Sequence, residues 1–255
     1  MIQMKIDNLS VAFQEKEVLK SVSVNFKGGQ MVSVIGPNGT GKTTLVKAIA
    51  KLNRYAGSIL IYDKDQTLID KNQIAYVPQM ASTQTELTVF EMVLLGRVKD
   101  LSWRVETIHL DAVSSILNKL GLSDLSTRPF SKLSGGQRQM VIMAQALVSN
   151  PKVLLLDEPT SALDLRHQLQ VLEVARQYCK ETGGITVVVL HDLGLAARYS
   201  DEMILLNGGY AVKKGRPEDV LDIKLLERAY QVEVDVSTNN SGYMTVTPVK
   251  PSQVV

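Results

Sequence analysis

Cysteine is almost absent from this 255-residue chain, in which Cys179 is the only one. An internal disulfide is therefore impossible, and we expect a reducing compartment. An excess of one charge is also absent, because 28 Lys and Arg residues are nearly balanced by 26 Asp and Glu residues, for a formal net charge of +2. Without a Lys/Arg-rich run, this balance gives no basis for a nucleic-acid-binding surface.

Long apolar runs are missing as well. No stretch approaches the length of about 18 apolar residues that a membrane span needs, so we expect that the chain does not cross a bilayer by itself. Residues 1–9 alternate polar and apolar side chains and lack the charged and then apolar segments of a secretion signal. Any role at a membrane would then come through a partner. The length permits one domain, or one domain with an inserted subdomain.

Glycine, by contrast, is concentrated in one stretch. Residues 36–44 read GPNGTGKTT and follow an apolar run at 31–35. The pattern G-x-x-x-x-G-K-[ST] predicts a phosphate-binding loop, because a Gly-rich turn before a helix directs successive backbone N–H groups at phosphate oxygens. Lys42 can reach the β- and γ-phosphates, and the Thr43 hydroxyl can ligate magnesium. An ordinary Gly-rich turn is the alternative. The residues predicted to bind phosphate are Gly36, Pro37, Asn38, Gly39, Thr40, Gly41, Lys42, Thr43 and Thr44.

The hydrophobic pattern predicts an α/β chain. Residues 153–156 and 187–190 are apolar throughout, which is typical of strands covered on both faces of a parallel sheet. Gly28 and Gly29 predict a hairpin that delivers the strand at 31–35 into the phosphate loop. From about 88 to 128 the apolar spacing becomes helical, which indicates an inserted helical subdomain. Further strands are predicted at residues 5–6, 9–13, 22–26, 57–61, 74–77, 203–206 and 232–236, and helices at 42–53, 135–149, 165–181 and 217–230.

Two carboxylates end one of the buried strands. Residues 153–158 read VLLLDE, four apolar residues followed by Asp157 and Glu158. At the carboxyl end of a strand, Asp157 can hold magnesium through a water, and Glu158 can accept a proton from an attacking water or orient it. A buried strand that ends in solvated acids is the alternative, but the phosphate loop elsewhere in the chain favours the metal site.

A second Gly-rich motif lies before a predicted helix. Residues 133–137 read LSGGQ, and the helix that follows would present backbone N–H groups and the Ser134 hydroxyl to an anion. A Ser N-cap with a Gly-rich turn is physically sound as an alternative. That alternative leaves Gln137 and the other motifs unexplained.

Together, GPNGTGKT, VLLLDE and LSGGQ resemble the Walker A, Walker B and signature motifs of the nucleotide-binding subunits of ABC transporters. The resemblance extends over about residues 3–236. It implies an α/β fold with a P-loop NTPase core, a mostly parallel sheet, an N-terminal antiparallel β subdomain and an inserted helical subdomain. The implied ABC ATPase domain spans 1–236, with its core at 1–87 and 129–236 and the helical subdomain at about 88–128, followed by a C-terminal tail at 237–255.

The resemblance also implies roles for residues outside these motifs. Gln79 in YVPQ corresponds to the Q-loop glutamine, Asp164 to the end of the D-loop SALD, His191 to the switch histidine and Phe13 to an aromatic that stacks on adenine. Each has a plainer alternative: Gln79 could cap a strand, Asp164 could cap a helix, His191 could be structural and Phe13 could belong to the core. The implied catalytic residues are Glu158, His191, Lys42 and Gln79; the metal ligands are Thr43, Gln79 and Asp157; further ATP-binding residues are Phe13, Ser134, Gly135, Gly136, Gln137 and Asp164.

The resemblance further implies ATP and Mg²⁺ as cofactors and a homodimer, because the family pairs each Walker A motif with the signature of the opposite subunit. The implied partners are transmembrane permease subunits and, indirectly, a substrate-binding protein, with no nucleic acid expected. The implied location is the cytoplasmic face of the cell membrane, as a peripheral subunit. A cytosolic ABC ATPase that acts on nucleic acid or ribosomes is the alternative; such proteins commonly carry two cassettes or a coiled-coil insertion, and neither pattern is seen here.

Four segments resemble the ATPases of iron-siderophore, haem and cobalamin importers in particular. These are residues 88–97, which end in LGR, residues 161–168, which read SALDLRHQ, and the C-terminal segments at 215–221 and 230–234. Met140 and Gln145 stand where relatives commonly have arginines. The resemblance thus implies ATP-driven uptake of an iron chelate or a cobalamin-like substrate. His109 and His167 have no partner that the sequence reveals, so we expect surface or packing roles for them.

Overall fold

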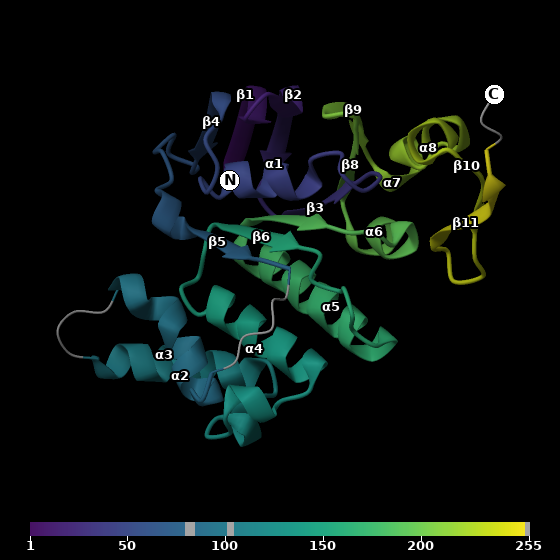
Figure 1. Cartoon of the computed structure of the whole chain (residues 1–255). Helices are drawn as coiled ribbons and strands as arrows, with labels where there is room; N and C mark the ends of the chain where they lie inside the picture. Colours follow the sequence, from purple (N-terminus) through teal and green to yellow (C-terminus); the bar gives the residue numbers. More distant parts are fainter. Residues whose placement is uncertain (80–84, 101–104, 253–255) are drawn as a thin grey trace.

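A computed structural model describes residues 1–79, 85–100 and 105–252 (Figure 1). The described residues form three sheets. The largest has the strand order β5-β6-β7-β3-β8-β9, and its strands are parallel to their neighbours except for β9, which runs antiparallel to β8. Its strands are β3 (Gln30–Ile35), β5 (Ile74–Val77), β6 (Val153–Asp157), β7 (Ile185–Val189), β8 (Glu202–Asn207) and β9 (Tyr210–Gly215).

Both faces of this sheet are covered, as its apolar strands predict. In β3, Val32 and Val34 join an apolar cluster with α1 and the N-terminal sheet, whereas Met31 and Ile35 join a second cluster on the opposite face with α4 and α5. Alternate residues of a strand point to opposite faces, so a strand that is buried on both must be apolar at nearly every position. All five residues of β6 and of β7 are buried.

The N-terminal sheet is antiparallel, in the order β2-β1-β4, and is built from β1 (Gln3–Phe13), β2 (Lys16–Lys27) and β4 (Ala56–Tyr62). The predicted hairpin at Gly28 and Gly29 is wrong, because β2 and β3 belong to different sheets. The turn instead carries the chain from one sheet to the other: the Gly29 N–H donates to Gly184 O, and a Cβ on Gly28 would lie 2.5 Å from Gly183 O. Two adjacent strand patterns joined by glycines do not reveal which sheet each strand enters.

Helices form the remaining layers (Figure 1). On one side of the main sheet, α4 packs against α5, α2 and α3, and the short 3₁₀ segment η2 (Leu95–Asp100) continues α2. The helical insertion predicted at about 88–128 therefore contains α2, η2 and α3, and it rests on α4. The helices are α1 (Lys42–Ile49), α2 (Val89–Leu94), α3 (Thr107–Lys119), α4 (Gly135–Leu147), α5 (Leu165–Thr182), α6 (Leu193–Tyr199), α7 (Pro217–Val220) and α8 (Ile223–Tyr230).

The C-terminal segment forms an antiparallel hairpin of β10 (Val232–Thr238) and β11 (Met244–Pro251). In it β10 packs on α8 and β11 on α6, and the Arg198 guanidinium of α6 lies 4.5 Å from the Tyr243 ring centre. Residues 237–255 have no strand assigned from the sequence, because their polar, Pro-containing composition is typical of a loop. β11 is mostly exposed along its length, so burial leaves only a weak pattern there.

Candidate functional site

The phosphate loop connects β3 to α1 and depends on glycine at two close approaches. Gly36 has a φ of 143°, and a Cβ there would lie 2.1 Å from Leu206 O. Gly41 has a φ of 100°, and a Cβ there would lie 2.6 Å from Leu19 Cδ2. Neither position can accept a larger residue without moving the surrounding structure, since both the backbone angle and the space require glycine. The loop is therefore held against β8 on one side and β2 on the other.

Lys42 begins α1 with its side chain folded back along the loop. Its ammonium group donates to Gly36 O at 2.7 Å and to Pro37 O at 2.9 Å, and the residue is 5% exposed. Burial lowers the pKa of Lys42, while the nearby carboxylates of Glu158 and Asp157 oppose that change. A cation held beside the N-terminal backbone N–H groups of a helix is suited to bind phosphate.

Thr43 and Asp157 meet across α1 and β6. The Thr43 hydroxyl donates to Asp157 Oδ1 at 2.9 Å, and the Tyr76 hydroxyl donates to Asp157 Oδ2 at 3.1 Å. Asp157 is only 2% exposed. A hydroxyl and a buried carboxylate fit Mg²⁺, which prefers oxygen ligands and is commonly held by one or two carboxylates together with substrate phosphates. Within the described residues no three His, Cys, Asp or Glu side chains gather into a metal site of their own.

Glu158 lies one residue further, in a left-handed backbone conformation with a φ of 51°. This conformation is uncommon for a residue with a side chain and costs on the order of 1 kcal/mol or more. Gln79 Nε2 donates to Glu158 Oε2 at 2.8 Å, and His191 Nε2 lies 2.6 Å from Glu158 Oε1. The structure thus brings together three residues that lie far apart in the sequence, all at the carboxyl end of the parallel strands, where ligands of such sheets bind.

Lys42, Thr43 and Glu158 border a cavity of about 710 Å³, whereas Gln79, Asp157 and His191 are not part of its lining. Phe13, which is 51% exposed, lines the cavity rather than belonging to the core, as expected if its ring stacks on a base. None of the residues 133–137 or Asp164 lines this cavity. The lining residues are Phe13, Gln14, Lys16, Glu17, Val18, Lys20, Asn38, Gly39, Gly41, Lys42, Thr43, Thr44, Glu158, Gly208 and Gly209.

The LSGGQ segment forms the N-terminus of α4. The Ser134 hydroxyl accepts from the Gln137 N–H at 3.3 Å, and the Gln137 side chain accepts from the Ser134 N–H at 3.0 Å, which completes a capping box. This capping box is the plainer alternative for the motif and also explains Gln137. It leaves the remaining N–H groups at this helix end available to an anion.

His167 has a clear position, although no partner for it was evident from the sequence. Its Nδ1 lies 2.8 Å from Asp164 Oδ1, and its ring covers Gly136, where a Cβ would lie 2.2 Å from His167 Cδ2. Asp164 also caps α5 by accepting from the His167 N–H. The D-loop and the signature motif therefore meet within one chain through this ring.

His109 is buried, at 6% exposure, and its Nδ1 accepts a hydrogen bond from the Arg97 guanidinium at 3.2 Å. Arg97 also reaches Val148 O at 3.5 Å. The preceding Gly96 lies so close to α4 that a Cβ would lie 2.0 Å from Gln145 O. The LGR segment therefore packs the helical insertion closely against α4.

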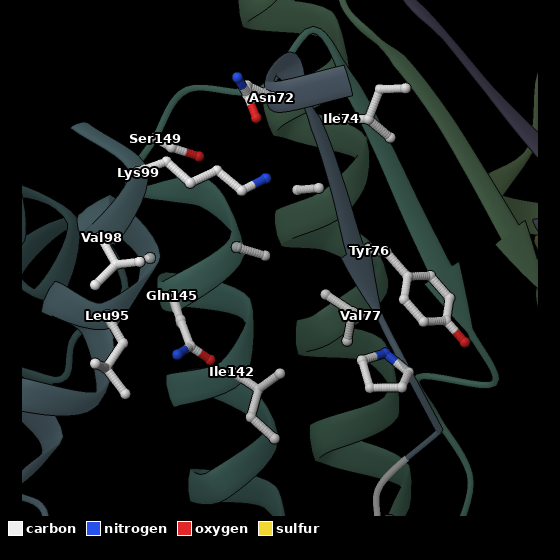
Figure 2. Close-up of a pocket in the computed structure, with 14 residues that line it drawn as sticks. Asn72, Ile74, Tyr76, Val77, Leu95, Val98, Lys99, Ile142, Gln145 and Ser149 are labelled. Atoms are coloured by element: carbon white, nitrogen blue, oxygen red, sulfur yellow. The ribbon is translucent and has the colours of Figure 1, made fainter. Parts of the chain in front are cut away.

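A second cavity, of about 270 Å³, lies between β5 on one side and η2 and α4 on the other (Figure 2). Leu95 and Val98 of η2 line it together with Ile142 and Gln145 of α4, and both η2 side chains are about half exposed. Pro78, the residue before Gln79, is also part of the lining of this groove. It separates the main sheet from the helical insertion.

Sequence reasoning missed Tyr76 as a neighbour of the candidate metal site. The hydroxyl of Tyr76 contacts a carboxylate 81 positions away, and the only signal in the sequence was its place three residues before Gln79. Burial, together with the Asp157 carboxylate, raises the pKa of Tyr76, so the hydroxyl stays protonated and able to donate. Lys16, Lys20 and the pair Gly208–Gly209 in the cavity lining also carry no motif that would have identified them.

A phosphate loop at the end of a parallel strand, with an acidic strand end beside it, defines a P-loop nucleoside triphosphatase. Residues 19–161 match the family model for ABC transporters. The chain is 38% identical over 251 residues to an uncharacterised ABC transporter ATP-binding protein of Methanocaldococcus jannaschii, covering 96% of this chain and 98% of that protein. The chain belongs to the ABC transporter ATP-binding proteins, and it is an ATP-binding ATPase of that family.

Other relatives bear on the subfamily. The petrobactin import ATP-binding protein of Bacillus anthracis is 35% identical to this chain over 238 residues. The alignment covers 91% of this chain and 88% of that protein. Proteins at 32–35% identity are named for transport of cobalamin, hemin and manganese. A solved metal-chelate type ABC transporter in an inward-facing conformation contains a chain that superposes with a TM-score of 0.86 at 26% identity, over 98% of both chains. These comparisons confirm the predicted fold.

No helix in residues 1–79, 85–100 and 105–252 is both long and apolar enough to cross a membrane.

Proposed function

We propose that this chain is the ATPase subunit of an importer and that it hydrolyses Mg²⁺-ATP to drive uptake of an iron chelate (siderophore or haem) or a cobalamin-like substrate. One observation carries the catalytic part: Glu158 is contacted by both Gln79 and His191 beside the cavity that Lys42 and Thr43 border. The choice of cargo rests on the LGR and SALDLRHQ segments and on relatives named for petrobactin and cobalamin.

In this proposal the phosphates of ATP lie along the loop at 36–44. Lys42 moves from its own loop carbonyls to the β- and γ-phosphates, where its charge is stabilised by an anion instead of by two dipoles. Thr43, Asp157 and Gln79 hold the metal. When bound, Mg²⁺ neutralises charge that develops on the phosphate oxygens. Phe13, which lines the cavity, stacks on adenine.

Glu158 orients the attacking water or accepts its proton, and its carboxylate is positioned for this by two neighbours. Gln79 donates to one oxygen, and His191 lies at the other. His191 is 45% exposed in its side chain, which leaves it room to reach the γ-phosphate, whereas Glu158 is 17% exposed.

The second half of each site comes from another copy of the chain. Ser134, Gly135, Gly136 and Gln137 cap α4 away from the cavity, so the anion that this helix end would bind is not the one held by the loop of the same chain. A homodimer in which each signature and each Asp164 faces the other copy's ATP satisfies both halves. ATP then favours the closed dimer because it contacts both chains, and hydrolysis releases it.

The permease is expected to contact the groove between β5, η2 and α4. Its half-exposed apolar side chains, Leu95 and Val98, offer a surface for a transmembrane partner (Figure 2). The groove lining also includes Pro78, the residue before Gln79. Such a contact would place the chain at the cytoplasmic face of the membrane as a peripheral subunit. A substrate-binding protein would then act only through the permease.

Replacement of the proposed base tests the catalytic assignment. Glu158→Gln should keep ATP binding and trap an ATP-bound dimer, while turnover falls by about 100-fold or more, since general-base catalysis contributes 10²–10⁴-fold. Turnover, nucleotide affinity and molecular mass by light scattering are measured together. Glu181→Gln is the matched control, because Glu181 pairs with Lys119 on the surface away from the cavity. Full turnover in Glu158→Gln removes Glu158 from the catalytic role.

The import assignment needs a separate experiment. A tagged chain expressed in its own cells should be recovered from membranes together with a transmembrane subunit, and cells lacking the chain should lose uptake of a labelled iron chelate or cobalamin. Recovery only from the soluble fraction, bound to RNA, would contradict the transport role. Loss of manganese uptake alone would contradict the proposed cargo.

A further inference from the structure

The carboxylate of Asp157 is held by two hydroxyl groups from two different elements. Thr43 of α1 donates to Oδ1, and Tyr76 of β5 donates to Oδ2. Two donors on the two oxygens fix the carboxylate plane, whereas a single donor would leave the group able to rotate about its terminal bond. Thr43 is already accounted for by the phosphate-loop motif. Tyr76 is the first residue of YVPQ, a segment in which the proposed function gives a role only to Gln79.

The sheet places Tyr76 on the correct side to make this contact. In the parallel pair of β5 and β6, Tyr76 is paired with Leu155, two residues before Asp157. Leu155 and Tyr76 both pack on the cluster that contains α1, while Val77 packs on the opposite cluster. Since alternate residues share a face, Asp157 points to the side of Leu155 and hence toward the Tyr76 ring.

We propose that Tyr76 is a positioning residue for the metal site: its hydroxyl holds the Asp157 carboxylate in the orientation in which Oδ1, beside Thr43, would bind Mg²⁺ through a water. Tyr76 touches neither nucleotide nor metal in this arrangement. The inference rests on the proposed magnesium role of Thr43 and Asp157. Hydrogen-bond partners behind a metal ligand commonly change metal affinity by about 10–100-fold, because they set the ligand's orientation and basicity.

Tyr76 also lies at a boundary between two functional regions. Figure 2 shows its ring on the side of β5 away from Leu95 and Val98, while β5 itself forms one wall of the groove. The same strand leads through Pro78 into Gln79. A displacement of β5 by a partner in the groove would therefore move the Tyr76 hydroxyl relative to Asp157.

The test compares nucleotide affinity with and without metal in the full chain. A fluorescent ATP analogue is titrated in EDTA and then in Mg²⁺, and the ratio of the two dissociation constants measures the contribution of the metal. Tyr76→Phe removes only the hydroxyl. We expect it to reduce this ratio by about tenfold, the lower end of the effect of partners behind metal ligands, with the EDTA value changed by less than about twofold.

Tyr178→Phe is the matched control, because its hydroxyl is also hydrogen-bonded, to Asn150 Oδ1 at 2.9 Å and Pro151 O at 3.0 Å, but lies away from the site. Urea unfolding of both variants checks that they are folded. An unchanged ratio in Tyr76→Phe, or an equal reduction in Tyr178→Phe, overturns the positioning role alone. No tightening by Mg²⁺ in the unaltered chain overturns the magnesium assignment itself, and the role of Tyr76 with it.

Discussion

The contact between His167 and Gly136 makes a sharp prediction about the signature motif. A Cβ on Gly136 would lie 2.2, 2.3 and 2.5 Å from three atoms of the His167 ring, where ordinary carbon contacts are about 3.5–4.0 Å. The ring would have to move by about 1 Å or more to make room. This movement would cost free energy, because it would disrupt the hydrogen bond between His167 Nδ1 and the carboxylate of Asp164. Gly136→Ala should therefore strain the junction of α4 and α5.

The magnitude follows from two opposing effects. Overpacking by one methyl group in a tight site costs about 1–3 kcal/mol. Alanine in place of glycine stabilises a helix by at most about 1 kcal/mol, and Gly136 is near the helix end where this gain is smaller. We therefore expect Gly136→Ala to lower the free energy of unfolding by about 1–2 kcal/mol. In a His167→Ala background the ring is gone, and the same change should be neutral or stabilising.

Urea unfolding of the four chains in this cycle measures the coupling between the two positions, expected at about 1–3 kcal/mol for residues in direct contact. Gly135→Ala is the control, because it is the adjacent residue of the same helix and no atom lies within 4 Å of its Cβ position. If Gly136→Ala is as stable as Gly135→Ala, the predicted steric conflict between position 136 and the His167 ring is refuted. It is equally refuted if Gly136→Ala costs the same with and without the His167 ring.

Two further predictions concern packing and the single thiol. Gly96→Ala should destabilise the chain by about 2–3 kcal/mol in urea unfolding, because its Cβ would meet backbone, Gln145 O at 2.0 Å, which cannot rotate away; stability equal to that of the unaltered chain would contradict the close packing of η2 on α4. Cys179 is buried and donates to Gly184 O, and burial raises its pKa, so a disulfide reagent at pH 8 should label it only as the chain unfolds. Prompt labelling of the folded chain would contradict this. Because the pKa of the Cys179 thiol is higher in the folded chain than in the unfolded chain, its contribution to the free energy of unfolding is complete below the pKa of the unfolded thiol and is lost as the pH rises through the folded pKa.

The contiguous motifs were predictable because their chemistry and their local structure coincide. In residues 36–44 and 133–137, the glycines, the polar groups and the start of a helix are neighbours in the sequence. The local sequence pattern therefore predicts the local geometry directly. Buried parallel strands were equally readable from unbroken apolar runs. The turn at Gly28 and Gly29 was not, because local sequence marks a change of direction and carries nothing about which sheet receives the next strand.

By itself, the sequence determined that this chain carries a phosphate-loop motif and that it lies among the ABC ATPases. Only the tertiary structure decided which distant side chains act together. The order β5-β6-β7 and the parallel register bring Tyr76, Gln79 and His191 to the two carboxylates that end β6, and helix packing sets His167 against Gly136. Periodicity along a chain reports the faces of single elements, whereas contacts between elements depend on how those faces pack.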